Sequence, residues 1–315
     1  MSTSSEAGRA GEAVFAGKDP VFSIIVPTYN RPAELSECLE ALAGQTLPRE
    51  RFEIVVVDDG SESPPEAEVL AWDHQVDIRL VGRTNGGPSA ARNTGARHAR
   101  GRFLAFTDDD CRPAGDWLAA LQAAFASTPD ALLGGSTRVG NPENPYSVAS
   151  QQLNTYLYEY YNRDPERASF FASNNMAVPA DHFRALGGFA LTPTRTAEDR
   201  ELCHRWRESG RQLRFVEEAV VYHSHLLTRQ GFMTQHFHYG RGAVYFRREL
   251  ARRGGSFRLE PLPFYLDLLR FPFRDNSGWR AWRQAVLLGL SQASLAAGFL
   301  AELLSGQHQV TAAAE

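Results

Sequence analysis

Three consecutive carboxylates, Asp108–Asp110, follow a short apolar run that begins at Phe103. The run predicts a buried strand, and the carboxylates then stand at its carboxyl end, where the open edge of a sheet can offer oxygen ligands. Adjacent carboxylates repel one another unless a cation or hydrogen-bond donors lie between them. The triplet therefore indicates a site for Mg²⁺ or Mn²⁺ beside a diphosphate. The alternative is an acidic surface turn.

A second acidic pair, Asp58 and Asp59, stands at the end of another apolar run, Glu53–Val57. Further strands are expected at residues 22–26, 77–81 and 102–107, and helices are expected after the first strand and over residues 89–99. Strands that alternate with helices predict an α/β fold with a doubly wound, mostly parallel sheet flanked by helices. Such sheets bind ligands beyond the carboxyl ends of their strands, so both acidic groups favour a nucleotide site.

Two turns precede the predicted helices. Asn30 is expected to cap the first helix, which has Pro32 in its first turn. The second turn, Asn85–Pro88, can bring backbone N–H groups to a phosphate, although it lacks the Walker and GxGxxG spacings. Arg92 follows one helical turn later, where its guanidinium can meet phosphate or a base. The alternatives are an ordinary turn and a solvated arginine.

The second half of the chain carries other polar candidates. Glu198 and Asp199 open a predicted amphipathic helix, and a carboxylate there can take a proton from an acceptor hydroxyl, although acidic residues also favour first helical turns. His223 and His225 end an apolar run and would face the same side of a strand. They are either ligands or hydrogen-bonding surface histidines.

Composition narrows the class of protein. The chain has 315 residues, of which 43% are hydrophobic and 22% charged, and a net charge of −4 gives no electrostatic reason for binding nucleic acid. The three cysteines are widely spaced without a CxxC pair, which favours a reducing compartment. Residues 1–20 are small and polar and are interpreted as a disordered tail.

Four segments, in this order, resemble the family 2 glycosyltransferases: Ser23–Asn30, Val55–Ser61, Gly87–Asn93 and Phe106–Asp110. The resemblance extends over roughly residues 20–245. It implies the GT-A fold and a transfer reaction that mostly inverts the anomeric configuration. The domain expected is 21–250, with a nucleotide-binding half at 21–135 and an acceptor-binding half at 136–250, followed by a helical C-terminal extension at 251–315.

The resemblance also implies roles for individual residues. Asp110 is expected to contact Mn²⁺ or Mg²⁺ together with His223, and Asp108 is a further metal candidate; whether His223 or His225 is the ligand stays open. Asp199 is expected to be the catalytic base, with Glu198 as helper or acceptor contact. Asn174 and Asn175 are expected on the acceptor side, or form a structural turn. The residues expected to bind the nucleotide sugar are Pro27, Thr28, Tyr29, Asp58, Asp59, Gly87, Arg92, Asp108 and Asp109.

The C-terminal part mixes basic, aromatic and apolar residues. Residues 233–253 are rich in arginine and aromatic side chains, which is typical of helices at anionic membrane surfaces. Residues 285–304 are about long enough to span a bilayer, but polar residues interrupt the run. An interfacial or packed helix is therefore expected, with peripheral attachment at the cytoplasmic face of the membrane.

These expectations combine into one function. The chain is expected to be a metal-dependent inverting glycosyltransferase of the hexosyltransferase type that moves a sugar from a nucleotide diphosphate sugar to an acceptor hydroxyl, in cell-surface glycan or glycoconjugate synthesis. UDP is the expected nucleotide, although no residue distinguishes it from GDP or dTDP. The acceptor is a saccharide, a lipid-linked saccharide or another hydroxyl-bearing molecule. The alternatives are a nucleotide-sugar binding protein and a nucleotidyltransferase on a related sheet.

Overall fold

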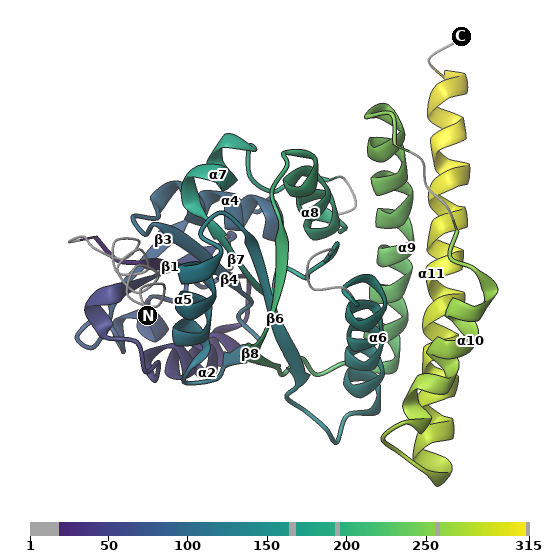
Figure 1. Ribbon diagram of the computed structural model, residues 1–315, viewed down its shortest axis with the longest axis horizontal. Helices are drawn as coiled ribbons and strands as arrows, with labels where there is room; N and C mark the ends of the chain where they lie inside the picture. Colours follow the sequence, from purple (N-terminus) through teal and green to yellow (C-terminus); the bar gives the residue numbers. More distant parts are fainter. Residues whose placement is uncertain (1–18, 164–167, 193–195, 256–258, 313–315) are drawn as a thin grey trace, which may run out of the picture. The chain divides into compact units, whose positions relative to one another are not determined.

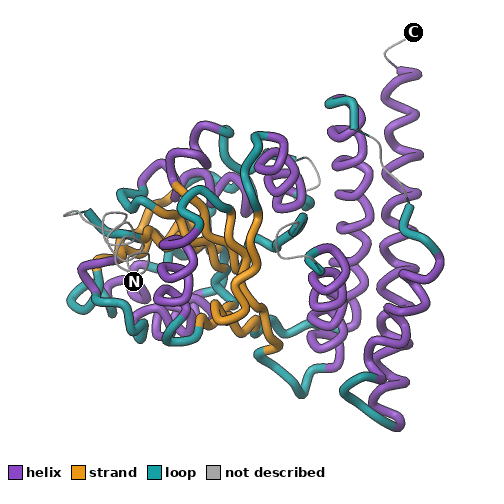
Figure 2. Tube along the Cα trace, in the orientation of Figure 1, coloured by secondary structure: helices purple, strands orange, loops and turns teal. Residues whose placement is uncertain are grey.

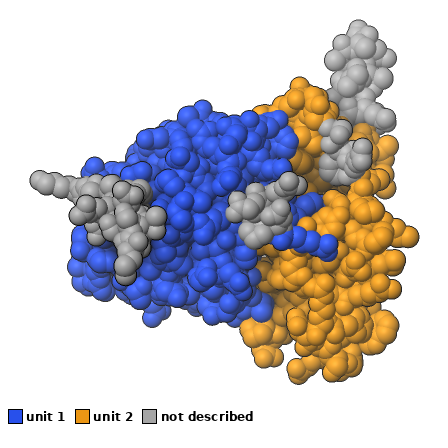
Figure 3. All heavy atoms as spheres, viewed as in Figure 1, with its two compact units in different colours: residues 1–140, 161–190, 202–224 blue, residues 141–160, 191–201, 225–315 orange. Residues whose placement is uncertain are grey.

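The computed structural model describes residues 19–163, 168–192, 196–255 and 259–312, so most of the expected tail at 1–20 lies outside the described residues. The chain forms two compact units, coloured separately in Figure 3. Unit 1 comprises residues 1–140, 161–190 and 202–224, and unit 2 comprises residues 141–160, 191–201 and 225–315. The chain thus passes between the units several times, whereas the sequence predicted consecutive blocks.

Unit 1 is built on one sheet, visible in orange in Figure 2, whose strands run in the order β3-β2-β1-β4-β7-β6-β8-β5. The first four neighbours are all parallel, as the sequence predicted. The other half is mixed, because β7 runs antiparallel to β4 and β6 while β6 and β8 are parallel. The strands are β1 (Phe22–Thr28), β2 (Phe52–Asp58), β3 (Asp77–Gly82), β4 (Phe103–Thr107), β5 (Cys111–Pro113), β6 (Leu132–Val139), β7 (Asn175–Pro179) and β8 (Leu213–His223).

Helices cover both faces of the parallel half because its strands alternate apolar residues between the faces. Ile24 and Val26 point into a large core that includes Leu35 and Leu39, whereas Val55 and Val57 form a smaller core with Ala91 on the other face. The helices of this part are α2 (Pro32–Ala43), α3 (Glu66–Leu70), α4 (Pro88–His98), α5 (Trp117–Ser127), α7 (Ala180–Ala185) and α8 (Glu198–Glu208), the last of which crosses the division between the units (Figure 1).

The start of α2 differs from the prediction. Pro32 does occupy its first turn, but the residue before the helix is Arg31, which makes no side-chain cap. Asn30 instead adopts a left-handed backbone with φ 54°, a conformation that asparagine tolerates well. Its side-chain oxygen accepts from the N–H of Glu62 at 2.9 Å, and its own N–H donates to Ser61 Oγ at 2.8 Å. Asn30 therefore ties the turn after β1 to the turn after β2.

Unit 2 is helical and consists of α6 (Pro145–Tyr161, of which residues 145–160 belong to this unit), α9 (Arg229–Arg252), α10 (Leu262–Arg270) and α11 (Gly278–Ala312). Thr228 caps α9 by accepting from the N–H of Gly231 at 3.0 Å. α9 and α11 run side by side, green and yellow in Figure 1. Their backbones touch, since a side chain on Gly240 or Gly298 would overlap a carbonyl oxygen of the facing helix.

Two glycines of α11 provide a matched test of this contact. An added Cβ at Gly298 would overlap the carbonyl oxygen of Phe237, whereas one at Gly289 would lie 3.8 Å from Leu269. We expect Gly298→Ala to lower the free energy of unfolding by about 1–3 kcal/mol through overpacking. Gly289→Ala should raise it by up to about 1 kcal/mol, because alanine favours the helix. Denaturant titration measures the change in the free energy of unfolding of each variant. Equal changes in the two variants would contradict the close approach of α9 and α11 at Gly298.

Candidate active site

The acidic pair after β2 organises the glycine-rich turn. The carboxylate of Asp59 accepts from the backbone N–H of Gly87 at 2.7 Å and of Gly86 at 3.1 Å, and it is paired with Arg83. The neighbouring Asp58 accepts from the N–H and the hydroxyl of Ser61 at 3.1 and 2.5 Å. The N–H groups expected to meet a phosphate thus donate to Asp59, which fixes the turn before α4.

The end of β1 lies beside both acidic groups. The carbonyl of Thr28 accepts from the N–H of Asp59 at 2.9 Å, and the Thr28 hydroxyl donates to Asp109 at 2.9 Å. Pro27 is buried within β1, whereas Tyr29 follows the strand and is 47% exposed. Thr28 therefore holds the acidic groups together, and Tyr29 presents an aromatic ring beside them.

Each member of the Asp108–Asp110 triplet has an arginine partner, and Asp109 and Asp110 share theirs. Asp108 accepts from Arg92 at 2.5 Å, and Arg92 is itself buried against the ring of Phe189. The guanidinium of Arg31 lies between the other two, 3.2 Å from Asp109 and 3.1 Å from Asp110. These cationic partners offset the repulsion between the adjacent carboxylates.

His223 reaches the triplet from the other half of the sheet. It is the last residue of β8, where it pairs with Cys111 of β5, and the following N–H of Ser224 donates to the carbonyl of Asp110 at 2.8 Å. This register sets the His223 Nε2 atom 3.2 Å from the Asp110 carboxylate. His225 lies two residues further along the chain, beyond the last residue of β8, and both histidines remain candidate metal ligands beside Asp110.

Burial and neighbouring charges change the acidity of two of these groups. Burial raises the pKa of Asp109 to about 7, helped by the charges of Asp110 and Asp108 and opposed by Arg31 and by the Thr28 hydrogen bond. Burial by itself would lower the pKa of His223, but the hydrogen bond and charge of Asp110 raise it above its usual value. Carboxylate oxygen and imidazole nitrogen are ligands suited to Mn²⁺, and Asp110 and His223 are close enough to share one ion.

The two expected acceptor asparagines have different environments. Asn175 is fully buried, and its amide contacts Trp117 Nε1, the carbonyl of Ser136 and the carbonyl of Ala219 at 2.9–3.1 Å. It therefore joins elements inside unit 1, and its expected contact with an acceptor is wrong. Asn174 lies one residue beyond the Thr107–Asn175 pair, at the end of β4 that carries the triplet. Its buried Oδ1 has no hydrogen-bond partner among the described residues.

The expected catalytic pair opens α8, and α9 holds this start. Glu198 is buried, and the residue before it, Ala197, has φ 69°, a strained conformation for a residue other than glycine. Thr196 donates from its hydroxyl to the carbonyl of His238 at 3.1 Å and fits where Gly242 of α9 has no side chain. One carboxylate oxygen of Asp199 accepts from the N–H of Arg200 at 2.7 Å.

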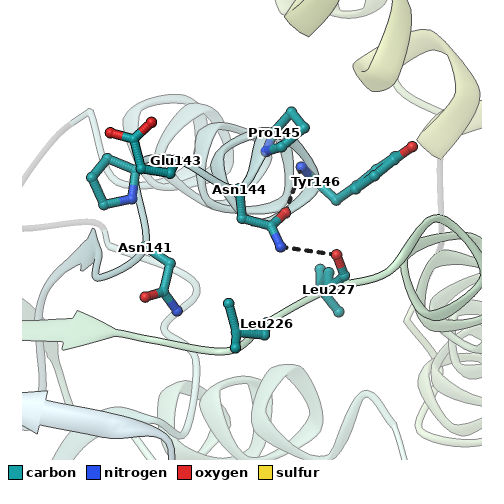
Figure 4. Close-up of a pocket in the computed structure, with 8 residues that line it drawn as sticks. Asn141, Glu143, Asn144, Pro145, Tyr146, Leu226 and Leu227 are labelled. Atoms are coloured by element: carbon teal, nitrogen blue, oxygen red, sulfur yellow. Dashed lines mark hydrogen bonds between the residues drawn. The ribbon is translucent and has the colours of Figure 1, made fainter.

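Unit 2 also contains an open hollow of about 460 Å³, shown in Figure 4. Asn144 joins the two lining segments: its amide nitrogen donates to the carbonyl of Leu227 at 3.0 Å, while its oxygen accepts from the N–H of Tyr146 at 3.0 Å. The two lining segments directly follow the ends of β6 and β8 along the chain. The lining residues are Asn141, Pro142, Glu143, Asn144, Pro145, Tyr146, Leu226 and Leu227.

Comparison with known proteins identifies the family. Residues 23–187, which include β1, β2, β4 and the acidic groups, match the family model described as Glycosyl transferase family 2. The chain belongs to glycosyl transferase family 2. The segment similarity noted in the sequence is thereby confirmed, and the protein is a glycosyltransferase enzyme.

Characterised relatives match a large part of the chain at low identity. Glycosyltransferase AglE of Haloferax volcanii is 26% identical over 65% of this chain and 67% of its own length. The pre-mycofactocin glycosyltransferase of Mycobacterium tuberculosis is 28% identical over 70% of this chain but only 46% of its own length. This family 2 chain therefore matches less than half of the mycobacterial protein.

Solved structures confirm the fold. Mannosyltransferase PcManGT from Pyrobaculum calidifontis, solved with GDP-Man and Mn²⁺, superposes with a TM-score of 0.64 at 20% identity, covering 95% of this chain and 93% of that chain. Staphylococcus aureus TarS 1–349 with UDP-GlcNAc gives a TM-score of 0.53 at 19% identity, covering 91% and 92%. This glycosyltransferase accordingly has the GT-A fold that the sequence predicted.

Two residues of the family 2 site were missed by the sequence interpretation. Arg31 follows the first motif and pairs with two carboxylates, and Arg83 pairs with Asp59. Isolated arginines in turns carry no signal of their own in a sequence. The available signal was the unbalanced charge, since an acidic triplet at a strand end requires cationic partners.

The role of Asp59 can be tested without any substrate. Asp59→Asn removes the charge that accepts from Gly86, Gly87 and Arg83, and we expect a loss of roughly 1–3 kcal/mol in the free energy of unfolding. Amide hydrogen exchange at Gly86 and Gly87 should become faster. The control is Asp73→Asn, since Asp73 is exposed. Unchanged exchange at both glycines would show that Asp59 does not hold the turn.

Proposed function

We propose that this glycosyltransferase is metal-dependent and inverting, and that it transfers a sugar from a nucleotide diphosphate sugar to an acceptor hydroxyl. The observation that carries the proposal is the meeting of Asp110 and His223 at the end of β4, beside Asp108 and Asp109. This is the edge of the parallel half of the sheet at which α/β folds bind nucleotides. The three cysteines are free and buried, which supports a reducing, cytoplasmic location.

The metal would be held by Asp110 and His223, with Asp108 as a further candidate. The Asp110 oxygen suits Mn²⁺ or Mg²⁺, the His223 nitrogen favours Mn²⁺, and the mannosyltransferase PcManGT was solved with Mn²⁺. A divalent cation there would offset the negative charge that develops on the diphosphate leaving group. Arg31 supplies a positive charge at the same carboxylates, and the exposure of 51% of its side chain leaves it able to turn toward a bound diphosphate.

The donor nucleotide would lie across the ends of β1 and β2. Tyr29 offers an exposed ring, Asp58 and Asp59 offer carboxylate oxygens, and Thr28 and Gly87 shape the backbone between them. Arg92 acts here by positioning Asp108. We propose a UDP-sugar as donor, supported by the TarS structures with UDP and UDP-GlcNAc.

The acceptor chemistry would centre on the start of α8. The Asp199 carboxylate takes the proton from the acceptor hydroxyl, and the acceptor oxygen attacks the anomeric carbon from the face opposite the diphosphate. The bond between that carbon and the diphosphate oxygen breaks, and the nucleoside diphosphate leaves with the electron pair. One displacement of this kind inverts the configuration. Glu198, buried next to Asp199, would contact the acceptor, and Asn174, whose buried Oδ1 has no partner among the described residues, stays a further acceptor candidate.

Metal-dependent nucleotide binding gives the first test. UDP at 100 times its Kd should stabilise the wild-type protein by about 2.7 kcal/mol in the presence of Mn²⁺ and by clearly less without it. In Asp110→Asn, UDP should stabilise the protein equally with and without Mn²⁺. Asp181→Asn is the control, because the Asp181 side chain is 97% exposed. If GDP, dTDP or CDP stabilises in place of UDP, the donor base is reassigned; if none does, the nucleotide site is wrong.

The base assignment is tested separately. Asp199→Asn keeps the size of the side chain but cannot accept a proton, and we expect transfer to fall at least about a hundredfold. Donor affinity, measured by calorimetry with UDP and Mn²⁺, should change less than about twofold because the base contacts the acceptor. Asp267→Asn on the exposed side of α10 is a matched control. Transfer that persists in Asp199→Asn would assign the base elsewhere.

A further inference from the structure

The outer face of α11 is apolar from Trp279 to Leu304. Helix Gly278–Ser305 has a mean hydropathy of 1.5 in its most apolar window, yet only 28% of that window is buried, and among the described residues it is the one helix long and apolar enough to cross a membrane. Its exposed apolar side chains recur every three or four residues and so form one stripe. The stripe consists of Trp279, Trp282, Val286, Leu290, Ala293, Ala297, Leu300 and Leu304.

The other face of α11 is occupied within unit 2, which fixes the direction of the stripe. Leu288 packs with Tyr156 and Leu268, and the Ser294 hydroxyl donates to the carbonyl of Met233 on α9 at 2.7 Å. Near the end of the helix, Glu302 pairs with Arg241 of α9 at 2.7 Å. The apolar stripe therefore cannot turn toward the helices of its own unit.

The stripe continues onto α10. Leu262, Leu266 and Leu269 are 70, 43 and 37% exposed and share one face of that helix by their spacing. Phe273, in the 3₁₀ turn that directly follows α10, has its ring 5.1 Å from that of Trp282 of α11 between centroids. We call the stripe together with these four residues the α10–α11 face. Continuous exposed apolar surface of this extent marks an interaction site.

Charge favours one kind of partner. Residues 225–315 contain eleven arginines and six acidic residues, a net charge of +5, although the whole chain carries −4. Arg280 is exposed beside the two exposed tryptophans, and the Arg283 guanidinium lies 4.5 Å from the ring centre of Trp279. Tryptophan and arginine together on an apolar helix are typical of the headgroup region of a bilayer.

We propose that the α10–α11 face binds the surface of a membrane that contains anionic lipids, with α11 lying in the plane of the interface. Crossing the bilayer is disfavoured because α9 runs beside α11 and carries Arg241, Arg247 and Arg248, each of which costs about 2.5–3.5 kcal/mol at the bilayer centre. A second copy of the chain fits less well, since it would present the same positive charge. Anionic headgroups complement that charge. This proposal does not depend on the proposed function.

Vesicle binding by the full chain tests the proposal. Flotation with vesicles of phosphatidylcholine and 30% phosphatidylglycerol should recover the wild-type protein, and pure phosphatidylcholine should bind roughly tenfold less. The double variant Trp279→Ser, Trp282→Ser should bind the anionic vesicles at least about tenfold more weakly, since each residue is 66% exposed on the α10–α11 face. The matched control is Leu70→Ser, Leu191→Ser, which removes two exposed apolar side chains elsewhere.

A second variant guards against loss of folding. Arg280→Gln with Arg283→Gln leaves the apolar stripe intact and should weaken binding to anionic vesicles while leaving circular dichroism and Tm unchanged. The proposal is overturned if the wild type does not float with anionic vesicles, or if both double variants bind as the wild type does. It is also overturned in favour of self-association if the wild type sediments as a dimer that Trp279→Ser, Trp282→Ser dissociates without any vesicle binding.

Discussion

Three carboxylates side by side at the end of a buried strand impose the constraint on which the rest of the site depends. Each must meet a hydrogen-bond donor or a positive charge, because neighbouring negative charges in a partly buried place otherwise destabilise the fold. The chain supplies Arg92 from α4 for the first, and Arg31 from the β1 turn for the second and third. His223 adds a contact to the third from β8. Elements from widely separated parts of the sequence therefore converge on one strand end.

The topology of the sheet makes this convergence achievable. Parallel β1, β2 and β4 end at the same edge, which gathers both acidic groups and the glycine-rich turn. In the mixed half, β8 pairs antiparallel with β5, the strand that immediately follows the triplet. Buried Asn175 holds this return in place through its contacts with three separate segments. The antiparallel pairings are thus what carries a histidine to the edge of an otherwise parallel nucleotide-binding sheet.

Unit 2 is organised by the close packing of α9 against α11 and against the segment that precedes α8. α9 and α11 approach until backbone meets backbone at Gly240 and Gly298, and the same helix α9 leaves room at Gly242 for the segment that begins α8. The contacts of Thr196 with α9 therefore help to position the start of α8, where Asp199 stands. The side of α11 that does not contact α9 remains apolar and exposed, which separates an inward packing face from an outward binding face on one helix.

The sequence by itself determined the four strands of the parallel half, the position of the carboxylates at strand ends, the family and the GT-A fold, because these follow from local periodicity and from motifs in a fixed order. Only the tertiary structure decided which donor meets which carboxylate, since Arg31, Arg83 and His223 reach their partners through pairings between distant segments. It also decided that the side chain of Asn175 is fully hydrogen-bonded inside unit 1, whereas the buried Oδ1 of its neighbour Asn174 has no partner among the described residues. Burial is a property of the assembled packing, and a local pattern does not contain it.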